Sequence, residues 1–257
     1  MAEFTSWLDF EKFSCSILNR NRYIHEKKVD DFLQAVLETS NERQVQLCEG
    51  SLLCRAQLGN DLEPHYDEKD NYDCDIPFPY HKKRMKPLPY QASEGRANPK
   101  GIPFLYLATK SDTAISEVRP WIGSLVSVGL FKTIKDLVLI DCSIAQKKTK
   151  FYLNEPDQEK MKKAVWTDID VAFSKPVTNN DNRAEYAPTQ IIAELFKTNG
   201  FDGIIYRSVF SNSNSGNEGK NIALFDINNA DLVNCQLFKV SGISIESSLE
   251  ENGYSIK

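Results

Sequence analysis

The first 47 residues carry the hydrophobic spacing of packed helices. Five apolar residues recur at the i, i+3, i+4, i+7 and i+8 positions of one helix face: Val29, Phe32, Leu33, Val36 and Leu37. An aromatic-rich stretch, residues 7–18, precedes them. We therefore predict a helical appendage over residues 1–47 that braces the rest of the chain, with a partner-docking face as the alternative.

A loop, a short strand and a helix are predicted in the middle of the chain. Glycine and proline punctuate residues 95–103, which indicates a loop, and the apolar run over 104–108 indicates a buried strand. Asp112 is expected to be the N-cap of a helix that ends near Pro120. This helix would turn its apolar residues inward: Ala114, Ile115 and Val118.

Three polar side chains are expected to converge in this unit. Because strand side chains alternate with a period of two, Phe104, Tyr106 and Ala108 would share one face. A tyrosine hydroxyl on an interior face needs a hydrogen-bond partner or a cavity. Tyr106 would lie near Arg96 from the loop and Glu117 from the helix. The plainer interpretation is a packing unit with a surface arginine and a solvated glutamate.

An arginine interrupts the apolar strand predicted over residues 51–58. Arg55 is costly inside such a strand unless it pairs with an anion or opens into a cleft. The alternative is an arginine at the edge of a sheet, with its stem lying along the surface. We favour the cleft.

The remaining apolar runs predict further elements. Strands are expected over residues 125–131, 137–142, 203–206 and 221–225, and helices over 158–166 and 188–198. Residues 61–93 carry five prolines and an acidic stretch followed by a basic one, which predicts a loop that could act as a lid over the site. Residues 211–219, rich in serine, asparagine and glycine, predict a second loop beside the site.

Composition and charge narrow the class of protein. The chain has 257 residues, 41% of them hydrophobic and 26% charged, which suits one large globular domain with an appendage. A net charge of −5 argues against a surface that coats nucleic acid. No apolar run has the length of a membrane span, and the first residues lack a signal-peptide layout. The six cysteines form no Cys-x-x-Cys pair, so we expect reduced, mostly buried thiols in a cytoplasmic protein with neither nucleic acid nor membrane as partner.

Several common catalytic patterns are missing from the sequence. The three histidines, His25, His65 and His81, show no metal-ligand spacing, so no metal is predicted. No Gly-x-Ser-x-Gly elbow, P-loop or dinucleotide-binding glycine fingerprint occurs either.

The central unit resembles the core of the RES domain, a family named for an arginine, a glutamate and a serine. Three motifs carry the resemblance: Gly95-Arg96-x-Asn98-Pro99-x-Gly101, Leu105-Tyr106-Leu107-Ala108 and Ala114-Ile115-x-Glu117-Val118. The family also has an arginine on an early strand, matched by Arg55, and a serine after a late Gly-Ile strand, matched by Ser208. The resemblance covers residues 47–237.

The resemblance implies an α+β fold, with a mixed β-sheet core flanked by helices, similar to ADP-ribosyltransferases. We expect an N-terminal helical appendage (1–47), a catalytic domain (48–237) and a C-terminal tail (238–257). Members are bacterial toxins that destroy NAD by phosphorolysis or hydrolysis, or that ADP-ribosylate a protein. NAD would be the substrate and no cofactor is implied, with inorganic phosphate as co-substrate of a phosphorolytic member and a cognate antitoxin as partner.

The resemblance also assigns residues. It implies these catalytic residues: Glu117, Arg96, Tyr106 and Ser208. It implies these NAD-binding residues: Arg55, Arg96, Asn98, Tyr106 and Ser208. Arginine forks grip phosphate oxygens, a tyrosine can stack on a ring, and a carboxylate can stabilise an oxocarbenium-like ribose. Ala97 stands where many members have tryptophan, so one wall of the pocket is expected to differ.

Three hypotheses remain open. The first is an enzyme that cleaves NAD and transfers ADP-ribose to phosphate or water. The second is a protein ADP-ribosyltransferase, and the third is a catalytically inactive nucleotide-binding module. For Glu117 itself, the competing interpretation is a solvated helix residue paired with Arg119 or Lys110.

Overall fold

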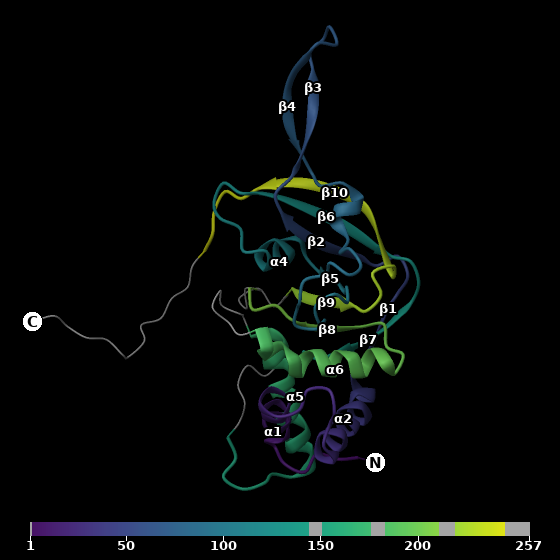
Figure 1. Cartoon of the computed structure of the whole chain (residues 1–257), viewed down its shortest axis with the longest axis vertical. Helices are drawn as coiled ribbons and strands as arrows, with labels where there is room; N and C mark the ends of the chain where they lie inside the picture. Colours follow the sequence, from purple (N-terminus) through teal and green to yellow (C-terminus); the bar gives the residue numbers. More distant parts are fainter. Residues whose placement is uncertain (1, 144–150, 176–182, 211–218, 245–257) are drawn as a thin grey trace, which may run out of the picture.

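The structure, a computed structural model, describes residues 2–143, 151–175, 183–210 and 219–244 (Figure 1). The strands of its main sheet are β1 (Gln44–Leu47), β2 (Leu52–Leu58), β5 (Leu105–Ala108), β6 (Leu125–Thr133), β7 (Leu137–Asp141), β8 (Gly203–Arg207), β9 (Lys220–Leu224) and β10 (Ala230–Lys239). A separate hairpin consists of β3 (Asp61–Tyr66) and β4 (Tyr72–Phe78). The helices are α1 (Asp9–Asn19), α2 (Lys27–Ser40), α3 (Lys82–Met85), α4 (Ser111–Glu117), α5 (Gln158–Ser174) and α6 (Ala187–Thr198).

The main sheet is mixed, with the strand order β1-β7-β8-β9-β5-β2-β6-β10. Only β7 and β8 are parallel among the described neighbours. In the middle, β5 and β2 are joined by the single pair Cys54–Ala108. The sheet therefore consists of two halves that meet at one point. The predicted α+β class, with a mixed sheet and N-terminal helices, is confirmed.

Alternating side chains divide the core into two main layers. Helices α1, α2, α5 and α6 lie together on one side of the sheet (Figure 1), where Trp166 and Phe196 pack against Ile204 of β8. On the other face, Leu105 of β5 and Phe131 of β6 join one cluster, so both halves of the sheet contribute to it. Burial of this many aromatic and aliphatic side chains is the main source of stability.

The short strand β5 has the alternation that the sequence predicts. Tyr106 packs against the helix-side cluster together with Phe104, which directly precedes the strand. Leu105 and Leu107 belong to the opposite cluster. Ala108 lies in a third, smaller cluster beneath α4. The side chain of Tyr106 is thus directed away from the leucine layer.

The N-terminal segment forms helices, as predicted. Val29, Phe32, Leu33 and Val36 of α2 are buried, and Phe13 of α1 stacks on Phe32 with ring centroids 4.6 Å apart. These rings belong to the main core, which is what a bracing role requires. The last four residues of the segment form β1, which pairs with β7 in the sheet. The division of the chain at residues 47 and 238 stays a prediction.

The prediction of a loop over residues 61–93 is wrong. Residues 61–78 form the β3–β4 hairpin, and α3 follows it. Acidic residues and two prolines hide the strand pattern, because both strands are edge strands exposed to solvent and need no apolar face. Figure 1 shows the hairpin projecting from the sheet.

Three smaller differences concern the ends of elements. Helix α4 begins at Ser111 after Lys110, so Asp112 lies in its first turn and is not the N-cap. Helix α5 continues to Ser174, eight residues beyond the predicted end. Strand β10 was not predicted, because its exposed face breaks the apolar run. The predicted loop over residues 211–219 lies, except for Gly219, outside the described residues.

All six cysteines are free in the structure. Only Cys142 is buried, whereas Cys15, Cys48 and Cys74 are exposed, so the prediction of mostly buried thiols is wrong. Among the described helices, none combines the length and the apolar composition that a membrane crossing needs.

Candidate functional site

A cavity of about 640 Å³ lies where β2, β5 and α4 meet the loop before β5. Its volume falls within the usual range for small-molecule sites, about 300–1,000 Å³. Five of the six predicted site residues line it: Arg55, Arg96, Asn98, Tyr106 and Glu117. The sixth, Ser208, does not line the cavity but contacts Glu117. Of the segment predicted as a lid, only Ser93 lines the cavity, so the hairpin is not a lid over this cavity.

Tyr106 and Asn98 hold the loop in place. The hydroxyl of Tyr106 accepts a hydrogen bond from the backbone N–H of Ala97 at 3.1 Å and donates one to Oδ1 of Asn98 at 2.7 Å. Nδ2 of Asn98 donates to three backbone carbonyls, those of Ser93, Pro99 and Ile102. Both polar side chains are therefore occupied by the loop itself. Their predicted part in binding NAD remains a prediction.

A glycine is required at the start of this loop. A Cβ atom on Gly95 would lie 2.5 Å from the hydroxyl oxygen of Tyr106 and 2.6 Å from Oδ1 of Asn98. Any larger residue would break the hydrogen bond between these two side chains.

Helix α6 supports the loop from the other side. Thr189 donates a hydrogen bond to the backbone carbonyl of Arg96 at 2.6 Å. Gln190 donates to the carbonyls of Gly95 at 2.9 Å and Asn98 at 3.1 Å. Both residues are buried. Sequence reasoning missed this role, although two polar residues at the start of an apolar helix were a signal that the helix faces polar backbone.

Arg55 is a half-buried cation in the wall of the cavity. Its Nη1 donates to the backbone carbonyl of Tyr106 at 2.9 Å, whereas its buried Nε has no hydrogen-bond partner among the described residues. Strand β2 lies between β5 and β6, so the alternative of an arginine at a sheet edge is wrong. Burial lowers the pKa of Arg55 to about 10, which leaves it protonated at neutral pH. A half-buried cation in the wall of a cavity favours an anionic ligand.

Arg96 reaches the cavity from the loop. Its Nη1 donates to the backbone carbonyl of Phe173, the penultimate residue of α5, at 2.5 Å, which fixes the guanidinium. The next residue, Ala97, is fully buried in the helix-side core and does not line the cavity. The expectation that one wall of the pocket differs stays a prediction.

Three tyrosines line the cavity: Tyr106, Tyr186 and Tyr206. Burial raises the pKa of Tyr106 and Tyr206 above the usual value, so both remain neutral phenols. Aromatic side chains beside a half-buried arginine suit a ligand that joins ring systems to an anionic group.

Glu117 is held by two hydrogen bonds to one oxygen. Oγ of Ser208 and Nδ2 of Asn221 both donate to Oε1, at 2.7 and 2.6 Å. Within the described part of the chain, no hydrogen bond reaches Oε2. Nor does an ion pair join Glu117 to Arg119 there. The carboxylate is thus fixed in orientation through Oε1, on a side chain that lines the cavity.

Sequence reasoning missed two further residues beside the carboxylate. Asn221 orients Glu117 from β9, and its position two residues after Gly219 gave no local signal. Arg119 lines the cavity with its backbone in the left-handed region, at φ 47°, and its guanidinium lies 5.6 Å from the ring of Phe210. A non-glycine residue in this conformation is uncommon and is often found at functional sites.

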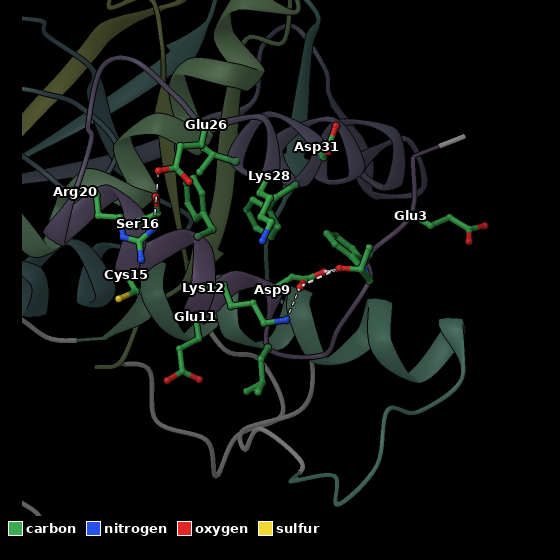
Figure 2. Close-up of a pocket in the computed structure, with 16 residues that line it drawn as sticks. Glu3, Asp9, Glu11, Lys12, Cys15, Ser16, Arg20, Glu26, Lys28 and Asp31 are labelled. Carbon is green, nitrogen blue, oxygen red and sulfur yellow. Dashed lines mark hydrogen bonds and ion pairs between the residues drawn. The ribbon is translucent and has the colours of Figure 1, made fainter.

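A second cavity, of about 810 Å³, lies between α1 and α2. Figure 2 shows charged side chains of both signs around it, including Asp9, Lys12 and Glu26. It contains none of the predicted site residues. No cluster that could hold a metal occurs among the described residues of either cavity.

Comparison with known proteins places the chain in a family. The RES domain matches residues 72–242. A solved structure entitled "Crystal structure of the M.tuberculosis MbcT-MbcA toxin-antitoxin complex" is similar at 12% identity and a TM-score of 0.41, covering 79% of this chain and 92% of that chain. A likeness this distant carries no statement about the activity of this chain. A comparison of the sequence with curated proteins found no match. With two thirds of its length matched, the chain belongs to the RES domain family.

Proposed function

We propose that this RES domain cleaves the bond between nicotinamide and ribose in NAD and transfers ADP-ribose to phosphate or water. One observation carries the proposal. A carboxylate, Glu117, is fixed by Ser208 and Asn221 in the same cavity as the half-buried cation of Arg55. NAD offers a counterpart to each, because its pyrophosphate is anionic and its ribose becomes cationic during cleavage.

The reaction needs no redox group. The bond from ribose C1′ to the nicotinamide nitrogen breaks, and the electron pair stays with nicotinamide, which leaves as a neutral molecule. A phosphate oxygen then bonds to C1′ in phosphorolysis. In hydrolysis a water oxygen bonds to C1′ and the water proton passes to solvent. In both cases the ribose carries positive charge in the transition state.

Each of the residues at this site has a separate role in the reaction. Arg55 and Arg96 bind the pyrophosphate oxygens, which arginine forks match in geometry. Tyr186 and Tyr206 offer aromatic faces to the ring systems of NAD. Glu117 directs Oε2 towards the ribose and stabilises the developing cation. Ser208 and Asn221 keep that carboxylate oriented.

The biological setting rests on the family alone. Because members are bacterial toxins, we propose a toxin-type activity in the cytoplasm that a cognate antitoxin restrains. Protein ADP-ribosylation uses the same bond cleavage with a protein side chain as acceptor, so it remains the alternative. An inactive nucleotide-binding module is the third candidate.

The test is incubation of the purified protein with NAD, with and without inorganic phosphate. Release of nicotinamide together with ADP-ribose-1″-phosphate, only when phosphate is supplied, indicates phosphorolysis. Equally fast release of nicotinamide and free ADP-ribose in phosphate-free buffer indicates hydrolysis. Unchanged NAD under both conditions contradicts the proposal, and ADP-ribose attached to protein favours the alternative.

A further inference from the structure

The β3–β4 hairpin holds three side chains of metal-ligating types that lie outside the lining of the cavity. His65, Asp73 and Cys74 each offer one ligand atom, and the three atoms lie within 4.8 Å of one another. Imidazole nitrogen, carboxylate oxygen and thiolate sulfur are all ligands that Zn²⁺ accepts. We propose that this cluster binds a divalent transition metal of the zinc class and that the metal fixes the hairpin.

A β-bulge brings the three side chains together. His65 pairs with Cys74 across the hairpin, whereas the next residue, Tyr66, pairs with Tyr72. Asp73 is therefore the extra residue of the bulge, and both Asp73 and Cys74 lie opposite His65. The cluster arises from this register shift, which is why the sequence shows no metal-ligand spacing around the histidine.

The distances are close to those of a tetrahedral site. Oδ2 of Asp73 lies 3.6 Å from Nδ1 of His65 and 3.9 Å from Sγ of Cys74. Around Zn²⁺, with bonds of about 2.1 Å to nitrogen or oxygen and about 2.3 Å to sulfur, neighbouring ligands lie about 3.4 Å apart for a nitrogen–oxygen pair and about 3.6 Å apart for an oxygen–sulfur pair. All three side chains are exposed, so small rotations close the difference.

A bound metal would stabilise the hairpin. Every residue of β4 is exposed, and the two strands pair only with each other. A two-stranded hairpin has little stability of its own in water. A metal bound to both strands would hold them in register, as structural metals do in small folds. The three protein ligands leave a fourth position for water.

Metal binding to this cluster should depend on pH, because protons compete with the metal for its ligands. The thiol of Cys74 gives up its proton to solvent when the metal binds, and the imidazole of His65 must be neutral. Metal affinity should therefore fall as pH is lowered. An ordinary exposed ion pair between His65 and Asp73 would behave in the opposite way, since it needs the protonated imidazole.

The test is a titration of chelator-treated full-length protein with Co²⁺ and then Zn²⁺. We expect one Co²⁺ per chain, a thiolate-to-cobalt absorption band, and its loss when Zn²⁺ displaces the cobalt. Cys74→Ser should abolish the band, and His65→Ala should weaken binding by at least about tenfold. Cys48→Ser and His81→Ala, which change an exposed cysteine and an exposed histidine outside the cluster, are matched controls and should bind as the parent does.

Two results would overturn the proposal. One is a cobalt band that survives in Cys74→Ser or disappears equally in Cys48→Ser. The other is unchanged hydrogen exchange of the amides of residues 61–78 with and without Zn²⁺, where the bound metal should slow it. Because the cluster lies outside the cavity lining, Cys74→Ser should consume NAD at the parental rate. The outcome is therefore independent of the proposed enzyme activity.

Discussion

Ser208 donates a hydrogen bond to Oε1 of Glu117 at 2.7 Å, although 91 positions separate the two residues. Ser208 directly follows β8, and Glu117 is the last residue of α4. Asn221 of the neighbouring strand β9 adds the second bond to the same oxygen. The sheet thus carries the two donors that fix a carboxylate presented by a helix. On this geometry the serine orients the glutamate.

The first prediction follows from that orientation. Ser208→Ala removes one of two hydrogen bonds, so NAD turnover should fall by about tenfold, which is less than the loss of the carboxylate charge would cause. Ser116→Ala on α4 is the matched control, since its hydroxyl bonds to a backbone carbonyl of its own helix, and it should keep parental turnover.

The effects of substituting Ser208 and Glu117 on NAD turnover should not be independent. If Ser208 acts only through Glu117, then adding Ser208→Ala to Glu117→Gln should lower turnover no further. Losses that multiply in the double variant would show that Ser208 acts independently, for example by positioning phosphate.

The second prediction concerns Arg55. Lysine keeps the charge but loses the fork, so Arg55→Lys should weaken NAD binding by about tenfold or more, since a hydrogen bond to a charged group contributes ~1.5–3 kcal/mol. Calorimetry measures this directly, and we expect a weaker affinity for Arg96→Lys as well. Arg84→Lys, near the hairpin, is the control. Parental affinity in Arg55→Lys would remove Arg55 from the binding site.

The third prediction concerns pH. Burial lowers the pKa of Arg55 to about 10, so the affinity for ADP-ribose, which keeps the pyrophosphate, should be level at neutral pH and fall as pH rises through about 10. Between this pKa and the value of 12.5 in the unfolded chain, the unfolded chain binds more protons than the folded chain. The contribution of Arg55 to the free energy of unfolding therefore rises with pH in this range. A loss of affinity at high pH would therefore not result from unfolding caused by deprotonation of Arg55. Arg55→Gln should bind more weakly and lack this pH dependence.

The fourth prediction concerns Tyr106. Tyr106→Phe leaves the N–H of Ala97 and Oδ1 of Asn98 without their partner, and both residues are buried. The free energy of unfolding should fall by about 1–3 kcal/mol, as measured by denaturant titration. Tyr90→Phe, at a side chain that is 93% exposed, should change it little. Equal stabilities of the two variants would mean that the hydroxyl does not support the loop.

Much of the helical layer and the central unit could be predicted from the sequence. Val29 to Val36 in α2 and Phe104 to Leu107 around β5 are buried with the expected periods, because each packs one face on a core. Five of the six residues that the RES resemblance indicates also line the cavity, and the sixth, Ser208, contacts Glu117. Patterns of this kind report local geometry and burial, which is why they worked here.

The missed features depend on pairing across long distances. The hairpin and β10 are largely exposed, so no apolar face shows in their sequences. Asn221 gains its role only because β9 lies beside β8 and near α4. The convergence of His65 with Asp73 and Cys74 depends on one register shift. None of these relationships leaves a spacing that a single sequence reveals.

The central claim is that the carboxylate of Glu117 stabilises the cleavage of NAD. Glu117→Gln keeps the shape of the side chain and removes the charge, which matters most in the transition state. We expect NAD binding to be retained while nicotinamide release slows by roughly two orders of magnitude or more. Asp112→Asn, at an exposed acidic residue on the same helix, should release nicotinamide at the parental rate. A Glu117→Gln protein that consumes NAD as fast as the parent would contradict the mechanism.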